Sequence, residues 1–425
     1  MYKILSKKSL PSFCTSNFDV LKVLMIFSKY HQLPTLIEST SNQVNQFGGY
    51  TGLKPLQFKQ KVDKLCKSVK LPSKLLIIGG DHLGPLPWKN VNKKSAMKNA
   101  KILVKKCLNA KYKKIHIDTA IVCRDEKNID RNIIVNRCEE ILKSLTKNDL
   151  KNVFIVVGTE VPFAGGGDHL KPVITKLESI KKEYLLYSQI FKQKKILKKK
   201  PFALVIDPGI GFNNLAITTT NLFGFRKKNS FSKKNNFYFE AHSSDYQSKT
   251  DLKRLVENNF KFLKVGPELT YIYSKSIFKM QSIEKLIYTK KLSDIDSVLS
   301  SEMNINKKYW KSYYKGPKKK IDFLLFNSYL DRSRYYWNKK KVINSKKILF
   351  KNINKLNENL FLRSFNLTKR KLKIKKLLKL SNTDFITYLF LEKVFAKYYS
   401  CLLYTSDAAD DSLRVDLGGR RIIKK

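Results

Sequence analysis

The sequence predicts a (β/α)8 barrel followed by a helical C-terminal extension. Short β-rich runs that end in Gly, Ser, Thr or an acid recur at a steady interval, and amphipathic stretches lie between most of them. Strands that alternate with helices form βαβ units and a parallel sheet. Eight repeats favour closure of that sheet into a barrel. The alternative, an open doubly wound sheet, would need a GxGxxG turn after its first strand, and this turn is absent.

The predicted strands follow one another in chain order. They are Ser12–Thr15, Thr35–Ser39, Leu75–Gly79, Lys114–Asp118, Val153–Gly158, Ala203–Asp207, Phe237–Ala241 and Phe262–Gly266. Helical spacing predicts helices between them, for example in Lys89–Asn109 and Arg131–Leu145. We interpret Lys195–Lys200 and Asn229–Asn236 as solvated loops inserted around the sixth and seventh strands.

The pattern of the sequence changes after the eighth strand. We therefore divide the chain into a barrel at residues 1–290, a Lys-rich helical extension at 291–400 and a tail at 401–425. Apolar residues recur at helical spacing in Lys371–Leu380 and Phe385–Tyr398, which lie in the extension. The tail changes composition abruptly and reads like translated sequencing adapter, so we expect it to be disordered.

Composition limits the classes of function. The chain has 425 residues, of which 42% are hydrophobic, and a formal net charge of +51. Lys supplies most of the basic residues, whereas phosphate-binding surfaces favour the planar fork of Arg, so we expect no nucleic-acid partner. We expect no nucleotide cofactor and no membrane partner, because the sequence has no GxGxxG turn and no long apolar segment near its start. Six Cys form no CxxC pair, which is typical of a cytoplasmic chain with buried thiols.

Polar residues gather where a barrel enzyme carries its chemistry, at the C-terminal ends of the strands. These residues are Glu38, Asp81, His82, Asp118, Glu160, Asp207 and His242. On the fourth strand, His116 and Asp118 alternate with Ile115 and Ile117. The polar pair is therefore predicted to face the barrel interior, and the isoleucines are predicted to meet the helices.

Two histidines suggest a metal site. His82 and His242 end the third and seventh strands, and with a carboxylate such as Glu160 they can hold one divalent ion, Zn or Mn, with a position left open. Such an ion would polarise a sugar carbonyl, and Asp81 is then a candidate proton carrier. The alternative is that both histidines are hydrogen-bonded structural groups.

The loops after the seventh and eighth strands are the usual phosphate cradle of this architecture. Ser243 and Ser244 follow the seventh strand, and Lys264 and Gly266 end the eighth. Lys264 can form a Schiff base or bind a phosphate, although we favour an ion pair with a neighbouring acid. Gly165–Gly167 is a weaker candidate for a phosphate-binding loop.

Several longer segments of the sequence give a more specific indication of its family. They are ESTSNQVNQFGGYTG at 38–52, IIGGDHLGP at 77–85, KIHIDTA at 114–120, VGTEVP at 157–162, EAHSSDYQ at 240–247, LKVGPELT at 263–270 and RSRYYW at 332–337. In their order and content they resemble the GatZ/KbaZ-like accessory subunits of class II tagatose-bisphosphate aldolase. One departure lies on the first strand, where the family has a His after Cys-Ser-Ala and this chain has Asn17 after Cys14-Thr15-Ser16.

The resemblance implies an accessory barrel that supports a separate catalytic aldolase subunit in galactitol and N-acetylgalactosamine catabolism. Some relatives resemble metal-dependent ketose 4-epimerases, so the alternative is an enzyme that acts on its own. A phosphorylated ketose and further copies of the chain are the other partners that we expect.

The resemblance also implies roles for individual residues. His82, Glu160 and His242 would bind the metal. The residues that would act on the substrate are Glu38, Asp81 and Asp118, and the binding of substrate or its phosphate is expected to involve Asn42, Gln43, Ser243, Ser244, Lys264 and Gly266.

Overall fold

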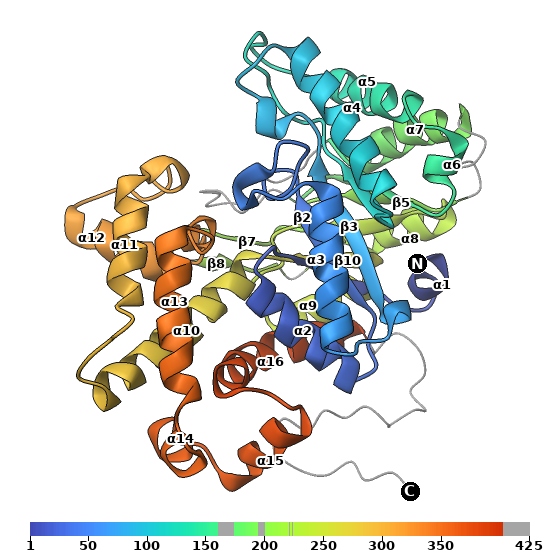
Figure 1. The fold of residues 1–425 in the computed structure, drawn as a ribbon. Helices are drawn as coiled ribbons and strands as arrows, with labels where there is room; N and C mark the ends of the chain where they lie inside the picture. Colours follow the sequence, from blue (N-terminus) through green and yellow to red (C-terminus); the bar gives the residue numbers. More distant parts are fainter. Residues whose placement is uncertain (160–173, 194–199, 221, 223, 403–425) are drawn as a thin grey trace, which may run out of the picture.

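The computed structural model describes residues 1–402 except 160–173, 194–199, 221 and 223. Within these residues, parallel strands form a closed barrel (Figure 1). Around the barrel the strands follow the order β1-β10-β9-β6-β5-β4-β3-β2. They are β1 Leu10–Cys14, β2 Thr35–Thr40, β3 Leu76–Leu83, β4 Lys114–Ile117, β5 Phe154–Val157, β6 Ala203–Val205, β9 Tyr238–Ala241 and β10 Phe260–Val265. Each coincides with a predicted strand, and the closed barrel excludes the open sheet. A short antiparallel pair, β7 Gly211–Phe212 and β8 Ile217–Thr218, lies outside the barrel.

The N-terminal half of the barrel interior is apolar. Its buried side chains form one cluster, which consists of Leu5, Leu10, Leu36, Ile77, Phe154, Val156, Ala203, Val205 and Phe262. The short helix α1 (Tyr2–Leu5) closes this end, because Leu5 is fully buried in the cluster and the Tyr2 hydroxyl donates to the Val153 carbonyl at 2.9 Å.

Helices cover the outside of the barrel. They are α2 Phe18–Tyr30, α3 Pro55–Ser68, α4 Lys93–Asn109, α5 Arg131–Lys143, α6 Lys147–Leu150, α7 Leu177–Gln193, α8 Arg226–Lys234, α9 Lys249–Glu257 and α10 Pro267–Ile287. Several begin at a side chain that accepts a backbone N–H of the first turn, as Asn17, Asn92, Asp130 and Ser248 do. The predicted helices at 89–109 and 131–145 correspond to α4 and α5.

The prediction of a loop at Asn229–Asn236 was wrong. Residues 226–234 form helix α8, because one face packs on the barrel although its sequence is rich in Lys and Asn. Ser232 is fully buried, and the Phe231 ring lies 5.8 Å from the Phe237 ring, centroid to centroid. The other predicted loop, at 195–200, falls almost entirely outside the described residues, as does Gly165–Gly167.

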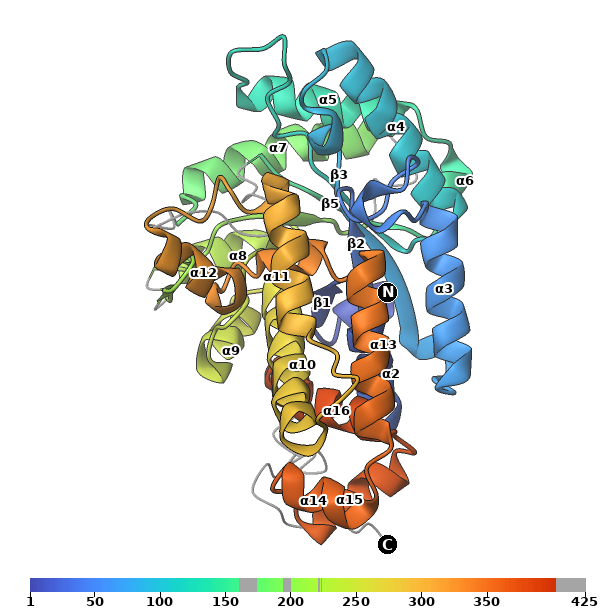
Figure 2. The same ribbon diagram turned by 60° about the vertical axis from the view of Figure 1, so that its left-hand side comes forward.

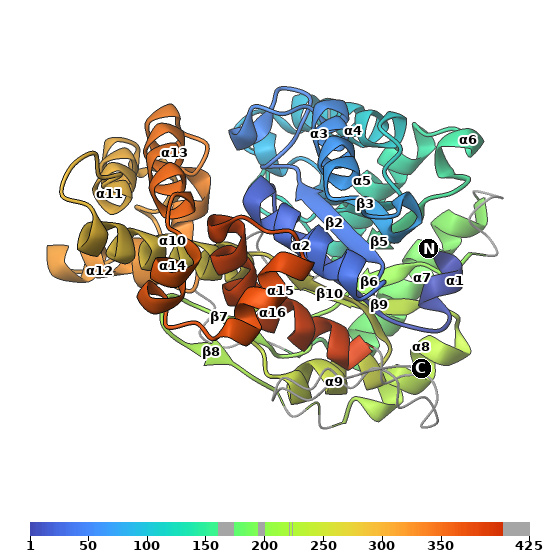
Figure 3. The same ribbon diagram turned by 60° about the horizontal axis from the view of Figure 1, so that its bottom comes forward.

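The extension consists of α11 Ile295–Ile305, α12 Lys318–Asn327, α13 Lys340–Asn354, α14 Glu358–Ser364, α15 Lys369–Leu377 and α16 Asn382–Leu402. Figure 2 shows α10, α11 and α13 side by side, beyond the barrel wall. Helix α16 returns to the barrel and packs on α2, α9, α10 and β1 (Figure 3). The Phe395 ring meets the Phe13 ring of β1 at 5.7 Å, so the last described helix belongs to the outer layer of the barrel. The domain boundary at 290 stays a prediction.

No helix among the described residues is both long enough and apolar enough to span a lipid bilayer.

Candidate metal centre and substrate pocket

Asp81 and His82 lie in an irregular stretch of β3. The pairing of β3 with β4 shifts register between Gly80 and Leu83, which is typical of a β-bulge. His82 has a φ of +46°, in the left-handed region, and its backbone N–H donates to Asp81 Oδ1 at 2.8 Å. Because of this irregularity, two consecutive residues both line the pocket instead of pointing to opposite sides of the strand.

Gly84 allows the end of β3 to approach β4 closely. A Cβ atom at this position would lie 1.6 Å from the Asp118 carbonyl oxygen, which no packing adjustment of a side chain can relieve. The Asp118 N–H donates to the Leu83 carbonyl at 3.2 Å across the same gap. The glycine therefore sets the spacing between the strands that carry His82 and Asp118.

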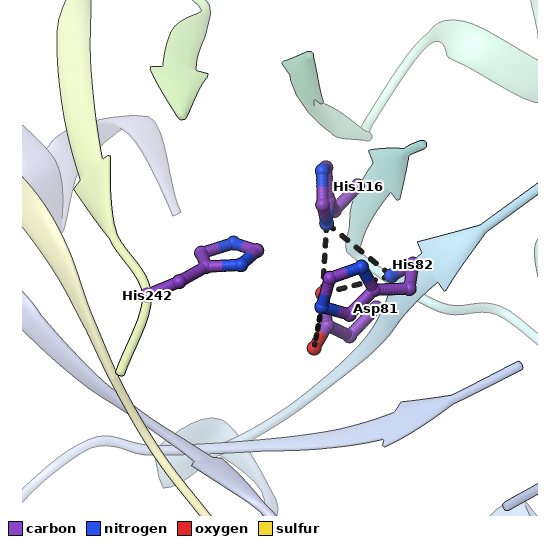
Figure 4. A group of neighbouring side chains, drawn as sticks. All are labelled: Asp81, His82, His116 and His242. Atoms are coloured by element: carbon purple, nitrogen blue, oxygen red, sulfur yellow. Dashed lines mark hydrogen bonds and ion pairs between the residues drawn. The ribbon is translucent and has the colours of Figure 1, made fainter. Parts of the chain in front are cut away.

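Three imidazole rings meet at the C-terminal end of the barrel. His82 belongs to β3 and His116 to β4, and His242 directly follows β9. The ring centroids of His82 and His116 are 5.1 Å apart, those of His82 and His242 are 4.9 Å apart, and those of His116 and His242 are 5.0 Å apart. Figure 4 shows the His242 ring pointing toward the other two. With Asp81, each of the four residues offers a ligand atom within 4.8 Å of the others.

Each imidazole has one ring nitrogen beside a carboxylate. The pairs are His82 Nδ1 with Asp118 Oδ2 at 2.7 Å, His116 Nδ1 with Asp81 Oδ1 at 2.8 Å and His242 Nε2 with Glu240 Oε1 at 2.9 Å. A carboxylate held against one nitrogen orients the ring and leaves the other nitrogen for an ion. The second nitrogen of His116, Nε2, is buried and has no hydrogen-bond partner among the described residues. The cluster therefore fits a divalent transition metal.

The charge states of the cluster also suit a metal. Burial, helped by the neighbouring His82, lowers the pKa of His116 to about 4 and that of His242 to about 3. Both rings are therefore neutral near pH 7, which is the form that binds metals. Burial raises the pKa of Asp118, but its interactions with neighbouring groups, first among them the hydrogen bond with His82, outweigh burial and lower that pKa.

Two lysines lie among carboxylates below the histidines. Lys114 Nζ is 2.5 Å from Glu38 Oε1 and 2.6 Å from Glu240 Oε2, and all three side chains are fully buried. Lys264 Nζ is 3.0 Å from Glu240 Oε1 and 3.5 Å from Glu38 Oε2, and it also contacts Asp81. Burial lowers the pKa of Lys264, whereas the two glutamates outweigh burial at Lys114 and raise its pKa. Lys264 thus makes the ion pairs with neighbouring acids that we favoured.

A pocket of about 900 Å³, part of it open to solvent, lies over this cluster. Its lining includes the predicted site residues Asn42, Gln43, Asp81, His82, His242, Ser243, Lys264 and Gly266. Glu38 and Asp118 are buried behind the lining, where they hold the lysines and His82.

The predicted phosphate cradle is arranged differently from the expectation. Asp245 Oδ1 accepts the N–H of Gly266 at 2.8 Å and that of Glu268 at 2.9 Å, so a carboxylate already caps the start of α10. The Ser244 hydroxyl donates to the Lys264 carbonyl at 2.7 Å and does not line the pocket. Glu160, the third predicted metal ligand, lies outside the described residues.

Sequence reasoning missed three residues of the site. His116 was expected to face inward but not to bind the metal, and Lys114 and Glu240 were not singled out. The alternation of side chains along a strand could have found them. Lys114 lies two residues before His116, and Glu240 lies two residues before His242, so each pair faces the same side of its strand.

Comparison with known proteins assigns the chain to a family. Residues 2–401 match the model of the D-tagatose-1,6-bisphosphate aldolase subunit GatZ/KbaZ-like family. The chain belongs to this family. Its role is therefore related to tagatose-bisphosphate aldolase, as the sequence resemblance predicted.

Solved structures share the fold. A protein from Sinorhizobium meliloti 1021, described as a probable tagatose 6 phosphate kinase, is 24% identical with a TM-score of 0.82, and the match covers 92% of this chain and 100% of that chain. A fructose-bisphosphate aldolase from Campylobacter jejuni is 15% identical with a TM-score of 0.44, over 83% of this chain and 92% of that chain. The first likeness confirms the barrel with its helical extension.

Proposed function

We propose that the chain is the partner subunit of a catalytic class II tagatose-bisphosphate aldolase and supports the activity and stability of that subunit. The observation that carries the proposal is the family match, which runs through both the barrel and the helical extension at residues 2–401. The pathway that we propose is the breakdown of tagatose 6-phosphate from galactitol or N-acetylgalactosamine, in the cytoplasm.

A second function is favoured by the three histidines that carboxylates orient. A scaffold has no need to bury two lysines, three histidines and their carboxylates at one end of a barrel, because buried charges are costly. We therefore propose, as the alternative, a metal-dependent 4-epimerase of a ketose or ketose phosphate. Its metal ligands would be His82, His116 and His242, and Glu160 stays a proposed ligand from the sequence alone.

The residues of the pocket can divide the work of such a reaction. A bound divalent ion would polarise the carbonyl of the sugar. Asp81 lines the pocket beside the imidazoles, and we assign it the transfer of a proton. The Lys264 ammonium, in contact with Asp81, can stabilise an oxygen that becomes negative. Glu38 and Asp118 act as positioning residues, because they hold Lys264 and His82 rather than line the pocket.

Elemental analysis of the purified chain, followed by turnover of tagatose and fructose bisphosphates with and without the cognate aldolase, tests both functions. The accessory function predicts no cleavage by the chain alone and a higher rate and longer half-life of the aldolase in its presence. The His82→Ala and His242→Ala variants should lose the metal. If they still activate the aldolase, the metal centre is separate from the accessory role.

One result would contradict the accessory role, and another would contradict the epimerase. A chain that neither binds the aldolase nor alters its rate contradicts the accessory role. Metal-free protein that is inert alone, yet activates its partner, eliminates the epimerase.

A further inference from the structure

A segment of the helical extension contributes a tyrosine to the pocket. The motif Arg332–Trp337 forms a 3-10 turn over Arg332–Tyr335, and Tyr335 lines the pocket together with Tyr50. No part of the proposed chemistry uses Tyr335.

Two guanidinium groups meet the hydroxyl of Tyr335. Arg332 Nη1 donates to the Tyr335 oxygen at 3.3 Å, and Arg334 Nη2 donates to the same oxygen at 3.1 Å. Hydrogen bonds and positive charges at a phenol oxygen favour its ionised form. Burial raises the pKa of Tyr335, but the charges of Arg334 and Arg332 and their hydrogen bonds outweigh burial and lower that pKa. Tyr335 therefore becomes a phenolate, which can take up a proton, at a lower pH than an ordinary tyrosine does.

The tyrosines that pack on Tyr335 are less suited to this role. The Tyr50 ring meets it edge to face at 4.8 Å, and the Tyr309 ring stacks on it at 4.5 Å, centroid to centroid. Burial is the first cause that raises the pKa of Tyr50 to about 12, and burial also raises the pKa of Tyr309. Asp331, directly before the turn, is a carboxyl group that faces Arg334. Of the three rings, Tyr335 is the one that ionises first.

Inversion at carbon 4 of a ketose needs a proton acceptor away from the carbonyl group. The hydrogen on carbon 4 is not adjacent to the carbonyl at carbon 2, so its direct loss is not assisted. A break of the bond between carbons 3 and 4 is assisted. The hydroxyl on carbon 4 loses its proton, its O–H electron pair forms a new carbonyl bond, and the pair of the broken bond moves onto the original carbonyl group. Asp81 is assigned to the carbonyl end, so another group has to take the hydroxyl proton.

We propose that Tyr335 is an acid–base group of the pocket and accepts the proton of a hydroxyl of the bound ketose. In the epimerase this is the hydroxyl on carbon 4, and Tyr335 returns the proton after the carbon–carbon bond has formed again on the other face of the carbonyl. The inference rests on the proposed epimerase function. It assigns this step to the C-terminal extension, with Arg332 and Arg334 as positioning residues.

Ultraviolet absorbance of the phenolate, followed as the pH rises, tests the ionisation of Tyr335 without a measurement of activity. The difference between the unaltered protein and Tyr335→Phe should show one tyrosine that ionises with a midpoint below about pH 10, the usual pKa of this side chain. A midpoint at or above that value would overturn the inference.

Tyr336→Phe is the matched control. Tyr336 is the next residue, lies outside the described pocket lining and donates its hydroxyl to the Asn306 carbonyl. Burial raises the pKa of Tyr336, so this change should leave the ionisation below about pH 10 as it is in the unaltered protein.

Tagatose is the probe for contact with the sugar. A bound hydroxyl that shares its proton with Tyr335 should move the ionisation midpoint of this tyrosine, both in the unaltered protein and in Tyr336→Phe. A midpoint that does not respond to saturating tagatose would overturn the inference.

Interconversion of tagatose and fructose measures the catalytic role. Tyr335→Phe should lower kcat at least about 100-fold and change KM by less than about two-fold, because it removes a proton transfer made in the transition state. In the unaltered protein kcat should rise with pH through the ionisation of Tyr335, since the phenolate is the form that accepts a proton. Tyr336→Phe should keep this rise, and Tyr335→Phe should lack it.

Thermal unfolding shows whether each variant folds. If Tyr335→Phe does not fold, carbon NMR of the unaltered protein labelled at tyrosine Cζ takes its place. One Cζ resonance should then move to the phenolate position below about pH 10 and respond to tagatose. The absence of such a resonance would overturn the inference.

The outcome is separable from that of the proposed function. An ionisation of Tyr335 that responds to tagatose, in a chain without turnover, supports the inference and contradicts the epimerase. Turnover that a folded Tyr335→Phe leaves unchanged does the reverse.

Discussion

Asp245 is a buried carboxyl group at the start of α10, where it accepts two backbone N–H groups. Burial raises its pKa from 3.8 to about 7, and the nearby Glu268 carboxylate contributes to the rise. Lys397 of α16 faces the pair, with its Nζ 2.6 Å from Glu268 Oε1, and partly offsets the negative charge. The protonation of Asp245 is therefore linked to folding.

The sign of this linkage follows from the raised pKa. Between about pH 4 and pH 7 the folded chain holds a proton that the unfolded chain has released, so the contribution of Asp245 to stability falls as pH rises. Asparagine accepts the same two N–H groups and does not titrate. We expect Asp245→Asn to gain stability relative to the unaltered chain by a few kcal/mol at most between pH 4.5 and pH 8, since one pKa unit is about 1.4 kcal/mol. Urea unfolding of both proteins at pH 4.5 and pH 8 measures the gain. An equal difference in their free energies of unfolding at the two pH values would contradict it.

Side-chain alternation along the strands predicted the orientation of several individual residues of the site. His116 and Asp118 were expected to face inward on the parity of their strand, and both are buried at the histidine cluster. The same rule applied to Lys114 and Glu240 would have found the buried ion pair. Alternation alone could not predict that Asp81 and His82 line the same pocket, because a β-bulge interrupts the alternation at this point. No residue of the sequence indicates this shift in register.

Among the elements, the strands were predictable and α8 was not. A central strand buried on both sides reads as a continuous apolar run, and the run stands out from the Lys-rich surroundings. Helix α8 buries only a narrow face, including Ser232, so its many Lys and Asn residues hide the helical period. The docking of α16 beside β1 was not predictable either, because its apolar face gives no sign of which partner covers it.

Helix α16 secures the loop that carries Ser243 and Ser244. The Tyr398 hydroxyl donates to the Ser244 carbonyl at 2.6 Å, and the Tyr399 hydroxyl donates to the Pro34 carbonyl at 3.0 Å, away from the pocket. Each Tyr→Phe change leaves a backbone carbonyl with one partner fewer and should lower the free energy of unfolding by about 1–2 kcal/mol.

The two variants should differ in ligand binding. We expect only Tyr398→Phe to weaken binding of tagatose 6-phosphate, because Ser243 of the same loop lines the pocket. Urea unfolding and calorimetry give the two readouts. Tyr399→Phe is the matched control, and an equal loss of binding in both variants would show that the loop has no special dependence on Tyr398.

At the scale of the whole molecule, the pocket joins parts of the chain that are far apart. The first strands, the loop at residues 41–54, the loop after β9, the strand β10 and the extension all contribute to its lining. The extension supplies Arg334, and α16 covers the barrel beside β1. The site is therefore complete only when the extension is folded against the barrel, which is consistent with a family match over almost the entire chain.

The ligands of the proposed ion come from β3, from β4 and from the residue that follows β9, so metal binding should stabilise the molecule as a whole. An ion that binds only the folded chain adds about 2.7 kcal/mol when its free concentration is 100 times its Kd. We expect the Tm of the chelator-treated protein to rise on addition of Zn²⁺ or Mn²⁺ and to fall again with chelator. His116→Ala should lose most of the rise, because it removes the buried Nε2 that has no partner among the described residues. His31→Ala, at the end of α2 and outside the cluster, should keep it. An equal rise in both variants would place the bound ion elsewhere on the chain.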